Sequence, residues 1–339
     1  VGAFVGSKLA ARDSGPARKA STLGLVQAAP RADPLPAMDV AAAAAIVGPS
    51  IVSVDTLAEI NGGTLRGSGT GIVLTKDGEI LTNAHVVADA TIVNVRLPGE
   101  TEPRTASVLA SDTGRDLALL RVEAGDLHPA TFAAPNDIRV GDPVVAVGFA
   151  LALDGDPSVT QGIVSALDRT SADGVRALKG LIQTDTPISS GNSGGPLINS
   201  LGQVLGVVTF VATSDNGAEA NSLGFAISTK ELLPTVDRLR ASVTGGTPPA
   251  GFLGVELSPR IDGGTGALVS SVVAGSGAQT AGIRIDDVVI AIDDVPITGQ
   301  AGLVATIRDR APGDSVHVDL VRGGAPLTVV VTLGDRPSN

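Results

Sequence analysis

The amino-acid sequence predicts a mostly β protein that is divided into two domains. The chain has 339 residues, more than one small module needs, and this length favours about two domains. From about residue 50 to residue 229, short apolar runs alternate with glycine and turn residues, with almost no helical periodicity between them. Regular short strands of this kind are typical of an antiparallel sandwich or barrel. A linker and a separate unit of about eighty residues follow.

Residues 1–37 are predicted to be a disordered tail. Alanine, arginine, proline and serine recur there without a strand or helix period. The tail starts Val-Gly-Ala-Phe-Val-Gly without an initiator methionine, and basic residues follow at 8–12. Two interpretations stay open: the start is the stump of a membrane anchor upstream of Val1, or it is a piece of linker.

The first domain is predicted over residues 38–242 and begins with an alanine-rich helix at residues 39–47. A β-rich run at residues 50–54 follows. The turn Lys76-Asp77-Gly78 lies between two apolar runs, which predicts a β-hairpin over residues 71–82. Further strands are predicted at residues 91–97, 117–122 and 143–147, and a second hairpin pairs residues 197–198 with residues 204–210.

A helix at residues 228–242 is expected to close the first domain. Ser228 and Glu231 have the spacing of a capping box. Four apolar residues recur on one helical face: Leu232, Leu233, Val236 and Leu239. Residues 243–250, rich in glycine, threonine and proline, are then predicted to be a linker.

The second domain is predicted over residues 251–335 and combines strands with helices. Thr298 is the expected N-cap of an amphipathic helix at residues 300–310, and a short helical turn lies near Gln279. Gly323-Gly324 joins the last two strands. The predicted strands cover residues 267–273, 288–292, 315–322 and 325–333.

Composition excludes several classes of function. The net charge is −11, which argues against nucleic acid because phosphate binding needs clustered lysine and arginine. With no cysteine there is no disulfide and no thiolate zinc site, and three histidines far apart in sequence form no His-Glu-x-x-His pair. Gly67-Ser-Gly-Thr-Gly71 lacks the lysine of a phosphate loop. We therefore expect neither a metal nor a cofactor.

The segment Gly191-Asn-Ser-Gly-Gly-Pro-Leu197 carries the strongest local signal of chemistry. Glycines around a serine let the backbone approach a carbonyl group and let amide N–H groups form an oxyanion hole. The segment also matches the Gly-x-Ser-x-Gly elbow of α/β-hydrolases, which needs a helix directly after the serine and a histidine later in the chain. Here Pro196 and a β run follow, so the hydrolase interpretation fails.

The order histidine, aspartate, serine is the alternative on a β scaffold. His85 stands at a strand end beside small residues and is the expected base, whereas His128 lies in a loop of surface character and His317 on the polar face of a strand. Asp116 opens a buried apolar run and is favoured as the acid. Four other aspartates are typical turn residues: Asp112, Asp126, Asp137 and Asp142.

Three segments in this order resemble the HtrA (Deg) family of trypsin-like serine proteases. They are Thr82-Asn-Ala-His85-Val-Val, Asp116-Leu-Ala-Leu-Leu and Gln183-Thr-Asp-Thr-Pro-Ile-Ser-Ser-Gly-Asn-Ser193-Gly-Gly-Pro-Leu. Gly251-Phe-Leu-Gly-Val255 then resembles the opening of a PDZ domain. The resemblance covers about residues 40–333. It implies a chymotrypsin-like double β-barrel protease domain followed by a small α+β PDZ domain.

The resemblance assigns expected roles to the residues of the catalytic site. Ser193 would attack the scissile carbonyl, His85 would take its proton, and Asp116 would hold the imidazole. The amides of Gly191 and Ser193 would form the oxyanion hole. Arg169, in a sensor loop at about residues 168–179, resembles the regulatory arginine of the family. Two further loops are implied, an oxyanion loop at residues 181–190 and a specificity-pocket segment at residues 211–222, and Ile188 is compatible with small aliphatic side chains.

The resemblance also implies a peptide-binding site in the second domain. Backbone amides of a loop that spans Phe252, Leu253, Gly254 and Val255 would capture the C-terminal carboxylate of a peptide, which would then add as an extra strand. The segment at residues 56–67 is short and only one PDZ domain is present. In both respects the chain resembles the membrane-tethered regulatory members more than the large cage-forming ones.

The sequence therefore predicts an ATP-independent, metal-independent serine endopeptidase that acts on unfolded or misfolded proteins. Its expected location is the extracytoplasmic bacterial cell envelope, and its expected assembly is a homotrimer. C-terminal peptides are the expected regulators, through the PDZ domain. The alternative is a peptide-binding holdase or scaffold with little proteolysis.

Overall fold

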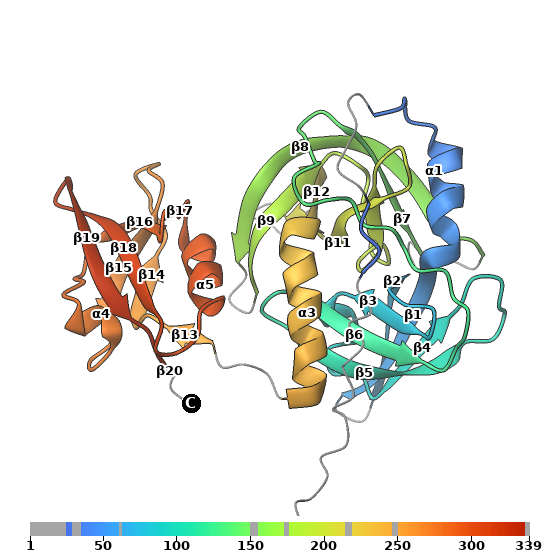
Figure 1. Cartoon of the computed structure of the whole chain (residues 1–339), viewed down its shortest axis with the longest axis horizontal. Helices are drawn as coiled ribbons and strands as arrows, with labels where there is room; N and C mark the ends of the chain where they lie inside the picture. The colour runs from blue at the N-terminus through green and yellow to red at the C-terminus, as the bar shows by residue number, and fades with distance from the viewer. Residues whose placement is uncertain are drawn as a thin grey trace, which may run out of the picture.

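The structure is a computed structural model that describes residues 25–28, 35–60, 63–149, 155–172, 176–213, 219–245 and 250–335. Figure 1 shows two bodies, a larger one built from two β-barrels and a smaller one built from the C-terminal residues. Among the described residues, no helix combines the length and the apolar character needed to cross a membrane. The mostly β fold class predicted from the sequence is confirmed.

The first barrel is closed and antiparallel, with the strand order β1-β2-β3-β6-β5-β4. The predicted hairpin forms, with Ile72 paired to Leu81 across β2 and β3. Gly78 in its turn has a φ of +102°, and a Cβ there would lie 2.1 Å from the carbonyl oxygen of Val122, so only glycine fits. The strands are β1 (Ile51–Ile60), β2 (Gly63–Val73), β3 (Glu79–Thr82), β4 (Ile92–Arg96), β5 (Arg104–Asp112) and β6 (Leu117–Val122).

The second barrel has the same construction, with the order β10-β11-β12-β9-β8-β7. Its second predicted hairpin also forms, with Leu197 on β10 opposite Gly206 on β11. Several register shifts interrupt the pairing of β8 with β9, which bends this long ribbon. The strands are β7 (Pro143–Gly148), β8 (Ser158–Ala172), β9 (Ala177–Thr184), β10 (Pro196–Ile198), β11 (Val204–Thr213) and β12 (Glu219–Ser228).

One apolar core joins the two barrels and two helices. It includes side chains from both barrels, such as Leu119 and Val207, together with side chains of α1 (Val40–Val47) and α3 (Thr229–Gly245). Phe132, in the connection between the barrels, is fully buried at its centre. Because burial of a large aromatic side chain stabilises a core strongly, Phe132 contributes to the packing that joins the barrels.

Residues 25–28, inside the segment predicted to be disordered, lie against this connection. Their backbone pairs with that of Phe132. The N–H of Phe132 donates to the carbonyl oxygen of Val26, and the N–H of Ala28 donates to the carbonyl oxygen of Phe132, both at 2.8 Å. Leu25 packs on the shared core. The prediction of a disordered tail therefore does not hold for these four residues, because they pair with the backbone of Phe132 and Leu25 packs on the apolar core. Residues 1–24 and 29–34 lie outside the described residues.

The C-terminal body has its own core around a five-strand antiparallel sheet path, β14-β15-β16-β18-β19, with β17 paired to β16 and β13 paired to β20. Helices α4 (Gly277–Thr280) and α5 (Gln300–Arg308) pack against it. Gly323 and Gly324 form the predicted turn between the last long strands, both with positive φ. The strands are β13 (Gly251–Phe252), β14 (Val255–Ser258), β15 (Ala267–Val272), β16 (Val288–Ile292), β17 (Val295–Pro296), β18 (Ser315–Arg322), β19 (Ala325–Thr332) and β20 (Gly334–Asp335).

Two predicted helix caps are wrong. Ser228 is buried, but its Oγ has no hydrogen-bond partner among the described residues, so no capping box forms at α3. Glu231 turns instead toward Lys179, with 3.9 Å between the two charged groups. At α5 the N-cap is Gly299, without a side-chain cap, and not Thr298. By contrast, Asp39 caps α1 by accepting the N–H of Ala42 at 3.0 Å.

The two bodies meet where α5 packs against β8 and β9, on the side of the C-terminal body that faces the barrels in Figure 1. This contact is polar. Asp309 pairs with Arg115 and, at 2.6 Å, with Lys179 of the barrels. Arg308 donates to the carbonyl oxygen of Ala177 at 3.0 Å.

Candidate active site

His85 and Asp116 form a hydrogen-bonded pair at the edge of the first barrel. His85 lies on α2 (Ala84–Val87), directly after β3, and Asp116 lies directly before β6. Nδ1 of His85 is 2.9 Å from both carboxylate oxygens of Asp116. The imidazole is 38% exposed and the carboxylate is fully buried. The structure thus brings together the histidine and the aspartate that the sequence analysis selected.

Asp116 is held by a set of donors that fix its carboxylate. Its φ of +57° lies in the left-handed region, which is strained for a residue with a Cβ. The Nδ2 group of Asn83 donates to its carbonyl oxygen at 2.8 Å, and the backbone N–H of His85 donates to Oδ1 at 3.0 Å. Oγ1 of Thr209, from the second barrel, donates to Oδ2 at 2.5 Å. A buried carboxylate needs such partners, so this network orients Asp116.

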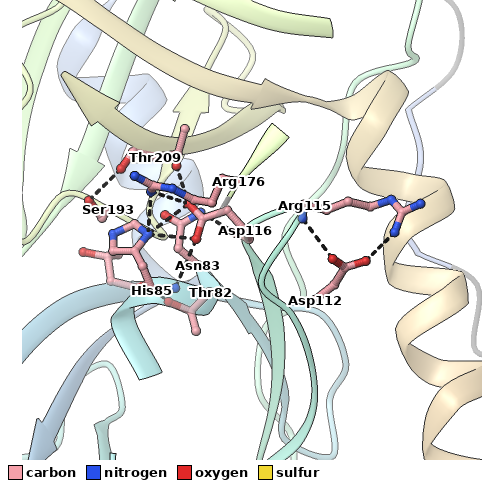
Figure 2. Close-up of polar contacts among 10 residues, drawn as sticks. Thr82, Asn83, His85, Asp112, Arg115, Asp116, Arg176, Ser193 and Thr209 are labelled. Carbon is pink, nitrogen blue, oxygen red and sulfur yellow. Dashed lines mark hydrogen bonds and ion pairs between the residues drawn. The ribbon is translucent and has the colours of Figure 1, made fainter. Parts of the chain in front are cut away.

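Ser193 lies in a glycine turn of the second barrel, and Figure 2 shows it beside His85, Asp116 and Thr209. The turn is tied to the first barrel, because the N–H of Thr70 donates to the carbonyl oxygen of Ser193 at 2.8 Å. Gly194 has a φ of +86°, and a Cβ there would lie 2.1 Å from the carbonyl oxygen of Thr70. The glycines of the motif therefore serve close contact between the two barrels.

Thr70 also holds the start of this turn. Its Oγ1 donates to the carbonyl oxygen of Gly191 at 2.7 Å and accepts the N–H of Phe149 at 2.9 Å. With the carbonyl of Gly191 fixed in this way, the amides of Gly191 and Ser193 make no hydrogen bond to any described residue. They are two donors beside the serine that have no partner in the described part of the chain.

The hydroxyl of Ser193 and the imidazole of His85 are not joined. Oγ of Ser193 donates to the carbonyl oxygen of Thr209 at 3.1 Å, and among the described residues no hydrogen bond links it to His85. Apo structures of hydrolases often show such long or missing catalytic contacts, which tighten when substrate binds. The site is therefore assembled on its histidine–aspartate side and relaxed on its serine side.

A cationic side chain also enters this site. Nη1 of Arg176 is 3.4 Å from Oδ2 of Asp116 and 3.5 Å from Nδ1 of His85. Its guanidinium carbon lies 5.8 Å from the ring centre of Phe210 on β11. The sequence analysis missed Arg176, and it also missed Asn83 and Thr209 as supports of Asp116. Arg176 belongs to no sequence motif, and no sequence signal could have placed it at the site.

Ile188, the side chain predicted to line a specificity pocket, packs against the buried Gly224. A Cβ on Gly224 of β12 would lie 2.5 Å from Cδ1 of Ile188. Ile188 is partly buried against the core of the second barrel. The specificity-pocket segment predicted at residues 211–222 lies in part outside the described residues.

The other predicted site residues lie away from this cluster. His128 and His317 are exposed, as expected. Arg169 lies on strand β8, where its Nε donates to Oε1 of Gln183 at 3.0 Å. Of the sensor loop predicted at residues 168–179, residues 168–172 belong instead to β8 and residues 177–179 to β9, and residues 173–175 lie outside the described residues.

The four residues predicted to bind a peptide are consecutive and lead from β13 to β14 of the C-terminal body. Phe252 belongs to β13, which pairs with β20, and Val255 starts β14, which among the described strands pairs only with β15. Leu253 is buried in the core. Gly254 has a φ of +87°, and a Cβ there would meet the side chain of Ser276 at 2.1 Å. Among the described residues no cluster of histidine, aspartate and glutamate could hold a metal ion.

Two closed β-barrels followed by a small sheet with two helices define a trypsin-like peptidase fold with one PDZ domain. The family model described as a trypsin-like peptidase domain matches residues 69–207, and the model described as a PDZ domain matches residues 251–333. The chain is similar to the HtrA-type protease AlgW, solved with a tripeptide, at a TM-score of 0.71 and 26% identity, covering 89% of this chain and 98% of that one.

Curated relatives identify the family. The serine protease PepD of Mycobacterium tuberculosis is 36% identical over 322 residues, which cover 88% of this chain and 67% of that protein. A probable periplasmic serine endoprotease, DegP-like, of Pseudomonas fulva is 36% identical over 280 residues, which cover 80% of this chain and 56% of that protein. The chain belongs to the HtrA family of serine proteases. It spans little more than half the length of the DegP-like relatives.

Proposed function

We propose that this protein is a serine endopeptidase with His85, Asp116 and Ser193 as its catalytic triad. The observation that carries the proposal is the hydrogen bond of 2.9 Å from Nδ1 of His85 to the buried Asp116, beside a serine in a glycine turn. A carboxylate on Nδ1 favours the tautomer whose Nε2 can accept a proton. This geometry supports a base role for His85.

In the proposed mechanism, Oγ of Ser193 attacks the scissile carbonyl carbon while its proton passes to Nε2 of His85. Asp116 stabilises the imidazolium that forms, and the amides of Gly191 and Ser193 bind the oxyanion. The imidazolium then returns the proton to the leaving amine, and water hydrolyses the acyl-enzyme by the same steps. One oxyanion donor is typically worth about 3 kcal/mol of barrier. The hydroxyl of Ser193 must first leave the carbonyl oxygen of Thr209.

The proposed substrates are unfolded or misfolded proteins, and the proposed regulators are peptides with a free C-terminus. The open edge of β14 can accept a peptide as an added strand, with Phe252, Leu253, Gly254 and Val255 at the carboxylate end. Solved relatives carry a bound tripeptide or decapeptide, which supports peptide binding in this family. Arg169 is proposed to relay this binding to the protease domain.

The names of the relatives support a location outside the cytoplasm, because several are periplasmic endoproteases. We propose the bacterial cell envelope for this protein, with a membrane anchor upstream of Val1 as one arrangement. A homotrimer formed by the protease domains is the proposed assembly, which multi-angle light scattering measures directly. The proposed domain boundaries are residues 38–242 and 251–335.

The test of the peptidase is cleavage of unfolded casein by wild type and by Ser193→Ala, each with and without a hydrophobic C-terminal peptide. We expect the substitution to reduce cleavage by several orders of magnitude. Ser107→Ala, an exposed serine of β5, is the matched control and should cleave as wild type does. No cleavage by any form, with aggregation still suppressed by both, would favour the holdase or scaffold instead.

The peptide site has a separate test. Gly254→Val places a branched side chain at a φ of +87°, where Ser276 leaves no space. We expect it to abolish binding of a fluorescent peptide with a free carboxylate, measured by polarisation. Wild type should also reject the same peptide when its C-terminus is amidated, because the carboxylate is then lost. Equal binding of both peptides by wild type would contradict carboxylate capture.

A further inference from the structure

We propose that Thr70 is a positioning residue that sets the direction of the oxyanion donor at Gly191. The proposal rests on the peptidase function proposed above. It gives a role to Gly67-Ser-Gly-Thr-Gly71, the glycine-rich segment that lacks the lysine of a phosphate loop. This segment lies on β2 of the first barrel, whereas the serine turn, residues 189–193, belongs to the second barrel between β9 and β10.

The N–H, the carbonyl and the hydroxyl group of Thr70 each make a hydrogen bond, and Thr70 is fully buried. The N–H donates to the carbonyl oxygen of Ser193 at 2.8 Å, and the hydroxyl donates to the carbonyl oxygen of Gly191 at 2.7 Å. The hydroxyl also accepts the N–H of Phe149 at 2.9 Å. One residue of the first barrel therefore holds the serine turn at two points.

The hydroxyl of Thr70 fixes the conformation of Gly191. The N–H of Asn192 donates to the carbonyl oxygen of Ser189 at 3.1 Å, which closes a four-residue turn, and Gly191 has a φ of +97° within it. Glycine adopts φ values of either sign, so the turn alone does not hold Gly191 in this conformation. The hydrogen bond from Thr70 holds its carbonyl end and thereby the direction of its N–H. Without the hydroxyl, the buried Gly191 loses this hydrogen bond, which favours a rearranged turn.

The same part of β2 contacts the segment that carries His85. The carbonyl oxygen of Thr70 accepts the hydroxyl of Thr82 at 2.7 Å, and Thr82 is the last residue of β3, three residues before His85. A Cβ on Gly69 would lie 2.7 Å from Cγ1 of Val86 and 3.1 Å from a carbonyl oxygen of the serine turn. Glycine at this position therefore lets β2 lie against the helix of His85 and the serine turn together.

A displaced donor at Gly191 affects the transition state more than the bound substrate. The oxyanion forms only as Ser193 attacks, and its donors act where this charge develops. Loss of one oxyanion donor lowers kcat by about 10²–10³-fold, and a donor that is displaced but still present should cost less, about 10- to 100-fold. We therefore expect loss of the Thr70 hydroxyl to lower kcat and to leave KM unchanged.

The first experiment measures kcat and KM on a peptide substrate. T70V keeps the shape of the side chain and removes the hydroxyl, T70A removes it without a methyl group in its place, and T70S keeps it. We expect T70V and T70A to lower kcat about 10- to 100-fold with KM unchanged, and T70S to stay within about threefold of wild type. T235V is the matched control and should cleave as wild type does, because Thr235 is also buried and its hydroxyl also donates to a backbone carbonyl, at 2.7 Å in α3.

The second experiment separates stabilisation of the oxyanion from ordinary binding. Oγ of Ser193 adds to the carbonyl carbon of a peptide aldehyde, the carbonyl electron pair moves to the oxygen that the oxyanion donors then bind, and the serine proton passes to His85. The same peptide ending in an alcohol binds without this addition. T70V should weaken inhibition by the aldehyde about 10- to 100-fold and leave inhibition by the alcohol unchanged. A general loss of structure would weaken both.

The third experiment needs no turnover. The sequence contains five Ser-Gly pairs, so serine labelled with ¹³C at its carbonyl and glycine labelled with ¹⁵N give five coupled amide signals, one of them from Gly191. Ser190→Ala removes the coupled signal of Gly191 and so assigns it. T70V should shift this signal, whereas T70S and T235V should leave it in place.

An unchanged kcat in T70V and T70A overturns the proposal, as does a loss of kcat that T70S shows to the same extent. Equal weakening of the aldehyde and the alcohol also overturns it. If wild type shows no cleavage that depends on Ser193, the peptidase function fails, and the signal of Gly191 still decides whether Thr70 holds the serine turn. The two failures are therefore distinguishable.

Discussion

The two interfaces of this protein differ in chemistry. The interface between the β-barrels is apolar, because one buried cluster combines side chains of both barrels, α1, α3 and Phe132. The interface between the barrels and the PDZ domain is made of charges, with Asp309 of the PDZ domain between Arg115 and Lys179. Among the described residues no buried apolar cluster includes side chains of both the barrels and the PDZ domain.

This difference in chemistry indicates that the interface between the barrels is fixed and that the interface with the PDZ domain can move. Burial of apolar surface is favourable in any orientation that excludes water, and a well-packed core resists displacement. Ion pairs contribute little net free energy, because the cost of removing both charges from water offsets much of their attraction, and salt weakens pairs that water still reaches. The barrel interface therefore holds the two halves of the candidate active site together, whereas the PDZ interface can open at a smaller cost.

The largest effect is expected at the centre of the barrel interface. Phe132→Ala removes a fully buried ring from the shared core, and a cavity of this kind costs about 3–5 kcal/mol of unfolding free energy. We expect chemical denaturation to show the protease transition at lower denaturant, with the PDZ transition unmoved. Leu320→Ala, in the PDZ core, is the matched control and should move only the PDZ transition. Transitions that move together in both variants would show that the interfaces do not differ as described.

A smaller effect is expected at the charged interface. Arg115 pairs with Asp309 across it and with Asp112, at 2.5 Å, within the barrel. A double-mutant cycle of Arg115→Ala and Asp309→Ala should give a coupling energy of about 1 kcal/mol that falls as salt is added. The coupling is measured from the protease transition of the full chain. A salt-independent coupling of several kcal/mol would instead indicate a rigid domain interface.

The same interface predicts opposite pH effects from two carboxylates. Burial raises the pKa of Glu231 above its ordinary value of 4.5, so ionised Glu231 destabilises the fold and stability is lost as pH rises through the raised pKa. Burial also opposes ionisation of Asp309, but the hydrogen bond and charge of Lys179, together with Arg115, outweigh it and lower the pKa. Asp309 therefore stabilises the fold above its ordinary pKa of 3.8, and this stability is lost at lower pH.

Thermal unfolding across pH separates the two groups. Glu231→Gln should raise the melting temperature slightly at pH 7 and flatten its dependence on pH above about 4.5. Asp309→Asn should lower the melting temperature at pH 7 and flatten the dependence of the melting temperature on pH below about 3.8. A lower melting temperature for Glu231→Gln at pH 7 would show that its pairing with Lys179 outweighs its burial.

The smallest effect is expected at an exposed pair of the first barrel. Nη2 of Arg121 lies 2.8 Å from Oδ2 of Asp77, and both side chains are well exposed. Arg121→Ala should change the unfolding free energy by no more than about 0.5 kcal/mol. Cleavage by this variant should equal that of wild type. If Arg121→Ala changed the unfolding free energy as much as Arg115→Ala does, the difference in burial between the two ion pairs would not explain their contributions to stability.

Local patterns were sufficient for most elements of the fold. Gly78 and Gly323-Gly324 mark turns that only glycine can make without strain, and both hairpins formed where they were predicted. The alanine-rich helix predicted at residues 39–47 formed at Val40–Val47, with Asp39 as its N-cap. These features depend on a few neighbouring residues, so the local sequence is enough to predict them. The two failed caps, at Ser228 and Thr298, lie where the helix ends meet other parts of the fold.

The three residues proposed as the catalytic triad were predicted from motifs, but the residues that support Asp116 were not. His85, Asp116 and Ser193 each lie in a segment with its own signature in the sequence. Thr209 and Arg176 have none, because each contributes only through contacts that form when distant strands come together. Thr209 lies 93 residues from Asp116 along the chain and yet donates to its carboxylate.

Local sequence patterns predicted the type of fold, the order of the two domains and the three residues proposed as the triad, because periodicity, turns and short motifs are local properties. The folded structure was needed to show the hydrogen bond of Ser193 to Thr209, the place of Arg176 beside the His85–Asp116 pair, and the charged contact of Asp309 with the barrels. Each of these depends on distances between side chains that are far apart in sequence. Electrostatic interactions depend steeply on such distances and on burial, and neither can be seen before the chain has folded.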